Sequence, residues 1–378
     1  MRKKYSFQIS ILLAVLLFTS CKKDTKEPII EPEPTPAPSP SYTTPTSYNF
    51  SNTNYSTSLT RISMMGEMIN YLKTTHTTTA LVQPTISATK LQNMYINSAS
   101  QFTDNALNTS GIQLKDETNN TFQFVTETEA NFIEAEAASI TAASNPTTTT
   151  ASNGTKGKLI SPARAILVNA NGFEYKELVE KGLMGAILYD KAMNKLNNIS
   201  AFDNTTIVNN QTAQEKAWDE AFGYFGVPVS FPTSTTGLKY WGSYCNSVSS
   251  AIGSNSLIMN AFLKGRAAIS NKDNAARDEA KSAVVANWEK VVAAKCISYL
   301  KGAKNNLSDQ ATLHHNLSEG YGFVRAFKYN SSKTISDSDI NLLLGYFGSN
   351  LYSITTGNID LAIAKLESVF SLNASLIP

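Results

Sequence analysis

The spacing of apolar residues is helical almost throughout the chain, and this constrains the fold more than any other feature. Near the start of the folded part, apolar residues recur every three or four positions, at Leu59, Ile62, Met65, Ile69 and Leu72. That interval places them on one face of an α-helix. No sustained alternation of apolar and polar residues, the pattern of a half-buried β-strand, is present. The sequence therefore predicts an all-α fold.

One helical segment occurs twice. Residues 218–225, WDEAFGYF, match residues 317–324, LSEGYGFV, in kind at every position: apolar, small polar, Glu, small, aromatic, Gly, aromatic and apolar. We interpret the match as an internal duplication with a period of about a hundred residues, far longer than the repeats of solenoid proteins. The chain is therefore predicted to form two pseudo-symmetric helical bundles, from residues 48–232 and 233–378, each containing one copy of this motif helix.

Further helices and their ends follow from the same spacing and from capping residues. Long helices are predicted over residues 173–193, 274–300 and 309–329. Thr212 and Glu215 have the spacing of a capping box at the start of the first motif helix, and Gly226 is placed to end it. Ser254 and Asn358 are predicted to cap two later helices.

The first 47 residues are predicted to lie outside the folded part. Basic residues 2–4 precede a short apolar run over 9–18, which is typical of a signal peptide and too short to span a membrane. "LFTSC", ending at Cys21, resembles the lipobox of bacterial lipoproteins. That resemblance implies removal of residues 1–20 and lipidation of Cys21; an ordinary secretory signal with a leftover cysteine is the alternative.

The segment after Cys21 is rich in proline, so residues 21–47 are predicted to form a lipidated, extended tether. Lys and Asp directly after the cysteine resemble an export signal of some Gram-negative lipoproteins. This favours an outer-membrane lipoprotein that is exposed on the cell surface over one that faces the periplasm. The predicted partner is the outer membrane, contacted through the lipid.

Composition excludes nucleic acid as a partner and does not decide whether a disulfide bond forms. With 32 Lys and Arg against 30 Asp and Glu, the chain has no basic footprint for nucleic acid. Cys245 and Cys296 are the only other cysteines. An oxidising compartment permits a disulfide between them, whereas the apolar surroundings of Cys296 favour a buried free thiol.

The two motif helices place a glutamate beside a glycine on the face opposite the apolar stripe. At about 100° per residue, His315, Glu319 and Gly322 share that face in the second copy, and Glu220 and Gly223 share it in the first. Glycine within a helix costs up to about 1 kcal/mol relative to alanine, so a close neighbour, either a backbone or a ligand, is expected there. By symmetry, we expect the two motif helices to approach each other with both carboxylates near the join.

Two interpretations of these carboxylates stay open. In one, Glu220, Glu319 and His315 hold iron, another divalent metal or a small polar ligand, since such metals accept imidazole and carboxylates. In the other, Glu220 pairs with Lys216 and Glu319 with His315, and the helices only pack. The remaining motif residues would support either site: Trp218, Asp219, Gly223, Gly320, Gly322 and Arg266. Arg266 could bind an anion, although a structural salt bridge is favoured.

Signatures of catalysis are missing from the sequence. The di-iron spacing Glu-x-x-His and the zinc-protease motif His-Glu-x-x-His do not occur, and no nucleophile has a recognisable base. A function without catalysis is therefore favoured, although the sequence does not decide whether the protein has enzymatic activity.

Five ordered motifs carry a family resemblance. They are YNFSNTNYSTSLTRISMMGEM, KGLMGAILYDKAM, AWDEAFGYFGVP, FLKGRAAISNKD and HHNLSEGYGFVRAFKY. Together they resemble an uncharacterised family of Gram-negative lipoproteins, which is more distantly similar to the imelysin-like, iron-regulated proteins. The resemblance implies an all-α fold of two bundles and a role in iron uptake. The imelysin motif Gly-x-His-x-x-Glu is altered here, because Leu313 replaces its glycine and His315 and Glu319 are one residue further apart.

Taken together, these features predict a cell-envelope lipoprotein that binds a metal ion or small ligand in iron or metal acquisition. A structural or interaction lipoprotein without a metal site is the first alternative. An imelysin-like metallopeptidase is the second.

Overall fold

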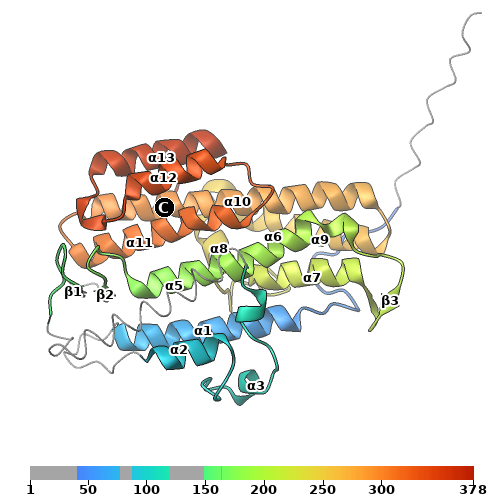
Figure 1. The fold of residues 1–378 in the computed structure, drawn as a ribbon. Coiled ribbons are helices and arrows are strands. Elements are labelled where there is room, and N and C mark those ends of the chain that lie inside the picture. The colour runs from blue at the N-terminus through green and yellow to red at the C-terminus, as the bar shows by residue number, and fades with distance from the viewer. Residues whose placement is uncertain (1–40, 77–86, 120–148, 163) are drawn as a thin grey trace, which may run out of the picture. The chain divides into compact units, whose positions relative to one another are not determined.

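The structure, a computed structural model, describes residues 41–76, 87–119, 149–162 and 164–378 (Figure 1). The chain from Pro40 to Pro378 forms one compact unit. Over the described ranges it is mostly helical, with two small two-stranded sheets, which confirms the all-α prediction in its general form. None of the described helices is long and apolar enough to cross a membrane. The predicted division after residue 232, and the signal peptide and tether that lie mostly outside the described residues, stay predictions.

The described helices, in chain order, are α1 (Ser56–His76), α2 (Ala88–Tyr95), α3 (Asn105–Asn108), α5 (Tyr175–Leu183), α6 (Asp190–Asn197), α7 (Ala213–Phe225), α8 (Trp241–Ile252), α9 (Ser254–Ser270), α10 (Asn274–Asn305), α11 (Gln310–Ala326), α12 (Asp337–Phe347) and α13 (Thr356–Phe370). Two antiparallel hairpins complete the fold, β1 (Gly157–Ile160) with β2 (Ala165–Val168) and β3 (Ile207–Val208) with β4 (Gln211–Thr212). The predicted motif helices are α7 and α11.

The long helix predicted over residues 173–193 is present and extends further. A π-helical segment, Met184–Tyr189, joins α5 to α6 without a break. Gly185 lies in this segment, and a Cβ there would come 2.7 Å from the ring of Tyr329, so the ring packs directly on the backbone. Wide turns of this kind are frequent at functional sites, and α5 carries the charged residues described below.

Two predicted helix ends are confirmed and two are wrong. Thr212 and Glu215 form the capping box of α7, and Gly226 ends that helix in the left-handed conformation at φ 78°. Ser254 does not cap α9, because its hydroxyl donates to the carbonyl of Cys245 and Gly253 precedes the helix. Asn358 does not cap α13, because the side chain of the preceding Thr355 accepts from the amide of Asn358.

The core lies between α10 and the helices on either side of it, α9 and α11. The three tryptophans, Trp218, Trp241 and Trp288, are fully buried there. The indole of Trp218 donates to the carbonyl of Phe262 at 3.0 Å. Cys245 and Cys296 are both buried and free, so the disulfide left open by the sequence is not formed.

The glycines of both motif helices are sites of close helix packing, as predicted. A Cβ at Gly223 would lie 2.8 Å from the Cβ atoms of Tyr55 and Ser58, at the start of α1. A Cβ at Gly322 would lie 2.3 Å from the Cβ of Lys181 in α5. Each motif helix therefore meets a different neighbour at its glycine. The sequence led us to expect that α7 and α11 approach each other on this face. Instead, the glycine of α7 packs against the start of α1, and the glycine of α11 packs against α5.

Replacement of Gly322 by alanine should destabilise the fold. The new methyl group would overlap the Cβ of Lys181, which cannot move without its backbone, so a loss of about 1–3 kcal/mol is expected. Chemical denaturation measures the change.

The matched control is Gly345→Ala in α12, where a Cβ meets no atom within 4 Å. That change should be neutral or gain up to about 1 kcal/mol from the better helix former. Equal effects at the two positions would contradict the close packing of α5 on α11.

Candidate functional site

A group of buried charges lies where α5 meets α11. Glu177 is fully buried and Lys181 is 3% exposed, while Glu319 of α11 is also 3% exposed. A buried charge is costly unless it is paired. The contacts of these three side chains therefore decide what the group can do.

One ammonium group contacts three carboxylates. The Nζ of Lys181 lies 2.9 Å from Oε2 of Glu177, 3.1 Å from Oε1 of Glu180 and 3.0 Å from Oε2 of Glu319. Its approach to Glu319 is close enough for an ion pair, but this oxygen gains no well-aligned hydrogen bond among the described residues. Lys176 contacts Glu177 and also lies 3.0 Å from Oε2 of Glu180. Lys181 thus bridges acids of both helices, whereas Lys176 pairs with acids of α5.

His315 brings an imidazole to the same carboxylates. Its Nδ1 lies 2.8 Å from Oε2 of Glu174 and 3.6 Å from Oε1 of Glu177, and its Nε2 lies 3.8 Å from Oε1 of Glu319. One ligand atom each from Glu174, Glu177 and His315 lie within 4.8 Å of one another. A zinc ion bonds such atoms at about 2.0–2.2 Å, so two ligand atoms of one ion lie at most about 4.4 Å apart. A small adjustment of the side chains would therefore bring all three atoms within reach of one ion.

Contacts from α11 fix the position of Glu174. The imidazole of His314 is hydrogen-bonded through Nδ1 to the carbonyl of Gly172 at 2.9 Å. The hydroxyl of Ser318 accepts from the amide of Glu174 at 2.9 Å and donates to the carbonyl of His314. Gly172 has φ 82°, and a Cβ there would overlap the His314 ring at 2.4 Å. The turn before α5 is therefore held directly against α11.

The surroundings separate the pKa values of the two central acids. Burial raises the pKa of Glu319 to about 7; neighbouring Glu177 adds to the rise, and Lys181 and His315 oppose it. Burial also acts to raise the pKa of Glu177, but Lys181 and Lys176 outweigh it and hold the pKa well below its ordinary value. Acids separated in this way can play different roles at one site.

A lysine and two tyrosines border the group. The Nζ of Lys295 lies 4.6 Å from the ring centre of Tyr299 and 5.6 Å from that of Tyr244. Burial lowers the pKa of Lys295. The tyrosine rings stabilise its charge through cation–π contact.

The structure brings together two of the three predicted ligands. His315 and Glu319 are neighbours, whereas Glu220 contacts Lys195 of α6 and lies 3.4 Å from the hydroxyl of Thr57. The pair of Glu220 with Lys216, expected if the glutamates are structural, is thus replaced by a pair with Lys195. The single site formed by all three predicted residues is not formed by these contacts.

The other predicted motif residues serve packing. Arg266 is fully buried and forms salt bridges of 2.9 Å with Glu215 and Asp219, so the structural interpretation of Arg266 holds. Trp218 packs on Gly265, where a Cβ would lie 2.0 Å from its ring. A Cβ at Gly320 would lie 3.2 Å from the ring of Phe347, which makes Gly320 a second close contact on α11.

Sequence reasoning missed Glu174, Glu177 and Lys181. A signal was present, because five of the eight residues from 174 to 181 are charged, against 16% of the whole chain. Glu177 and Lys181 also have the spacing of four that joins side chains on one helical face.

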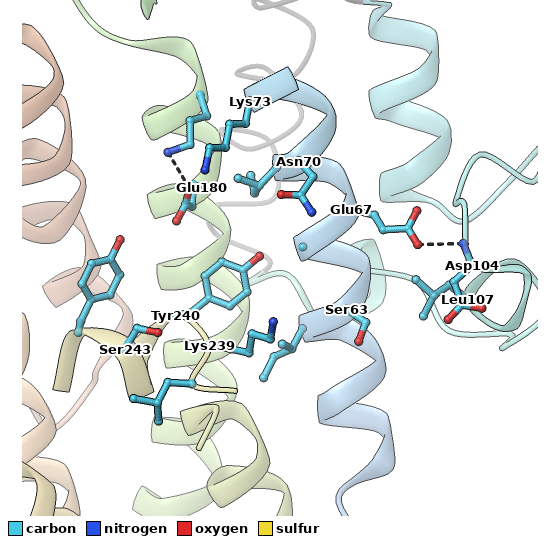
Figure 2. A pocket seen from close by; sticks show the side chains of 16 residues that line it. Ser63, Glu67, Asn70, Lys73, Asp104, Leu107, Glu180, Lys239, Tyr240 and Ser243 are labelled. Atoms are coloured by element: carbon cyan, nitrogen blue, oxygen red, sulfur yellow. Dashed lines mark hydrogen bonds and ion pairs between the residues drawn. The ribbon is translucent and has the colours of Figure 1, made fainter. Parts of the chain in front are cut away.

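A cavity of about 590 Å³ opens beside this group, between α1, α5 and the segment that leads into α8. Lys176, Glu180 and Tyr244 line the cavity and also belong to the charged group or its border. Figure 2 shows Glu180 and Tyr240 on one side, opposite Asn70 and Ser63 of α1. The cavity therefore gives solvent-sized molecules an approach to the charges of α5.

The fold and the site define a mostly helical domain with a buried ionic group at the junction of two helices. Residues 45–344 match a domain of unknown function, DUF4856, and the chain belongs to this family. No curated protein and no solved structure matches the chain.

Stability should fall as the pH rises from about 5 to 8. The folded-state pKa of Glu319, about 7, is above its ordinary 4.5, so its contribution is complete below pH 4.5 and is lost as the pH rises through 7. A difference of this size corresponds to about 3 kcal/mol. Burial acts to lower the pKa of His315, but the neighbouring carboxylates of Glu174, Glu177 and Glu319 together outweigh it and raise the pKa, which acts in the same direction.

Glu319→Gln should flatten this pH dependence, as measured by denaturation at several pH values. Glu279→Gln, at an exposed pair with Lys264, is the control and should keep the wild-type slope. An unchanged slope in the Glu319 variant would contradict the elevated pKa. Glu177 does not interfere, since its contribution is lost only at much lower pH.

Proposed function

We propose that the protein is a cell-envelope lipoprotein that binds a divalent metal ion through Glu174, Glu177 and His315. The convergence of these three ligand atoms within 4.8 Å is the observation that carries the proposal. Two carboxylates and one imidazole suit borderline metals such as zinc and iron. Of the ligands first expected from the sequence, only His315 remains in the set.

The residues around the ligands suit this role. With Nδ1 of His315 on the ion, its Nε2–H faces Glu319, whose Oε1 lies 3.8 Å away. A carboxylate behind a metal-binding imidazole orients the ring and strengthens its donation. Glu319 would then orient the ring of His315 without binding the ion itself.

The lysines are the main competitors of a metal. Lys176 and Lys181 both contact Glu177, so an ion must displace at least one ammonium from this carboxylate. This favours ions that bind carboxylate and imidazole strongly over those that bind carboxylates alone.

The same ion pairs support the alternative, a structural or interaction lipoprotein without a metal. In that case Lys176 and Lys181 neutralise the buried acids permanently, and the group only holds α5 against α11. A direct measurement of metal binding separates the two functions.

Metal binding should be measurable by calorimetry on protein freed of metal with a chelator and titrated with Zn²⁺, Co²⁺ and Fe²⁺. One ion per chain is expected, and Co²⁺ should show the absorption of a nitrogen- and oxygen-ligated ion. His315→Gln and Glu174→Gln should each weaken binding at least tenfold, because each removes a ligand.

Glu220→Gln is the matched control, since Glu220 pairs with Lys195 and not with the proposed ligands. It should bind metal like the wild type. Absence of binding, or equal loss in the control and the ligand variants, would favour the structural alternative.

The anchoring of the protein forms the second part of the proposal. The signal-like run and the lipobox-like sequence before Cys21 support lipidation of that cysteine, and the residues after it support display on the outer face of the outer membrane. The resemblance to iron-regulated proteins supports a role in iron or metal acquisition. These features are sequence signals, and Cys21 lies outside the described residues.

Cys21→Ala should move the protein from the membrane fraction to the soluble fraction, because the lipid is the proposed anchor. Cell fractionation with immunodetection measures the shift. Lys26→Ala, in the same segment, should leave the distribution unchanged. Retention of the Cys21 variant in membranes would contradict the lipid anchor.

A further inference from the structure

The cavity beside α5 combines an apolar wall with polar groups. Ile62 and Ile69 of α1 and Leu238 supply apolar surface, and Ser63 and Ser243 supply hydroxyl groups. Its volume of about 590 Å³ lies within the usual range for small-molecule sites, roughly 300–1,000 Å³. The cavity is therefore large enough for a small organic molecule.

The backbone at the cavity wall is strained. Tyr240, directly before α8, has φ 42° and ψ −111°, a conformation that bulky residues rarely adopt. Figure 2 shows its ring between α5 and α1, and a Cβ at Gly66 would lie 3.9 Å from its hydroxyl. Such strain persists where the surroundings enforce it, often at ligand sites. Tyr240 is thus held with its ring across the cavity.

The carboxylates that line the cavity already have hydrogen-bond or ionic partners. Glu67 accepts from the backbone amides of Thr103 and Asp104. Asp104 caps α3 through the amide of Ala106 at 2.9 Å. Both oxygens of Glu180 contact lysines. The acids of the lining therefore have little capacity left for a cationic ligand.

Lysines from three different elements line the same cavity. They are Lys73 of α1, Lys176 of α5 and Lys239 of the segment before α8. Lys239 is exposed to solvent, and each ammonium group has three hydrogens to donate. The three lysines equal the three carboxylates of the lining in number, so the formal charges balance. Because the oxygens of the acids are already engaged, the ammonium hydrogens, those of exposed Lys239 above all, are the groups left to contact a ligand, and they suit an anion.

We propose that this cavity binds a small organic anion that carries carboxylate groups. Its carboxylates would contact Lys176 and Lys239, and its carbon skeleton would lie on Ile69, Leu238 and the ring of Tyr240. Because Lys176 also contacts Glu177, bound anion would share this lysine with the charged group of α5. The proposal does not depend on a bound metal, and its test uses metal-free protein.

The test is calorimetry of metal-free, full-length protein with succinate, tricarballylate, inorganic phosphate and 1,4-butanediol. Saturable binding of one carboxylate ligand per chain is expected, with no binding of the neutral diol. Phosphate bound as tightly as the carboxylates would overturn the assignment to an organic anion, as would the absence of saturable binding.

Variants locate the site. Lys239→Gln should weaken binding of tricarballylate about tenfold, since it removes one charge from the lining. Lys290→Gln, an exposed lysine of α10 outside the cavity, should bind like the wild type. Equal affinity in these two variants would overturn the proposed location.

Gly66→Leu provides a second measurement, because its side chain would grow into the cavity from α1, where a Cβ has room. It should abolish binding while its melting temperature stays close to that of the wild type. Full binding in a folded Gly66→Leu variant would also overturn the proposal.

Discussion

The ammonium of Lys181 is the interaction on which the junction of α5 and α11 depends. This ammonium group is buried among Glu177, Glu180 and Glu319. The Cβ of the same lysine fills the space left by Gly322. Removing the charge would leave buried carboxylates that repel one another, which is far more costly than the loss of one exposed ion pair. The same side chain therefore sets both the distance between the two helices and the charge of the site.

The buried ionic groups around Arg266 and around Lys181 differ in how fully they are satisfied. Around Arg266, all three guanidinium nitrogens have partners, with Nε on Asp219, one terminal nitrogen on Glu215 and the other on Asn52 at 2.7 Å. Around Lys181, one ammonium is shared by three acids, and burial, together with neighbouring Glu177, keeps the pKa of Glu319 elevated although Lys181 and His315 oppose it. A saturated network suits a fixed support, whereas an incompletely paired one leaves groups that a ligand can engage.

The sequence was sufficient to predict the helices themselves and the close contact at the motif glycines. Residues 309–329, predicted as one helix, form α11 with a short 3₁₀ turn at its end, and Gly322 has a neighbour within contact distance. The identity of that neighbour was not predictable, because helical periodicity reports which face is buried and not which helix covers it. Glu220 and Glu319 match in the sequence, but Lys195 meets one and Lys181 meets the other. Tertiary packing thus separated two residues that the repeated pattern had placed together.

The contacts of α11 with the turn before α5 also set the order in which the site can assemble. Glu174 and His315 are 141 positions apart in the chain, and the contacts of His314 with Gly172 and of Ser318 with Glu174 span similar distances. Contacts between such distant segments form only after a large loop has closed. During synthesis, the carboxylates of α5 therefore emerge long before the imidazole exists. A chain interrupted anywhere between these helices would carry two of the three ligands and none of the geometry that joins them to the third.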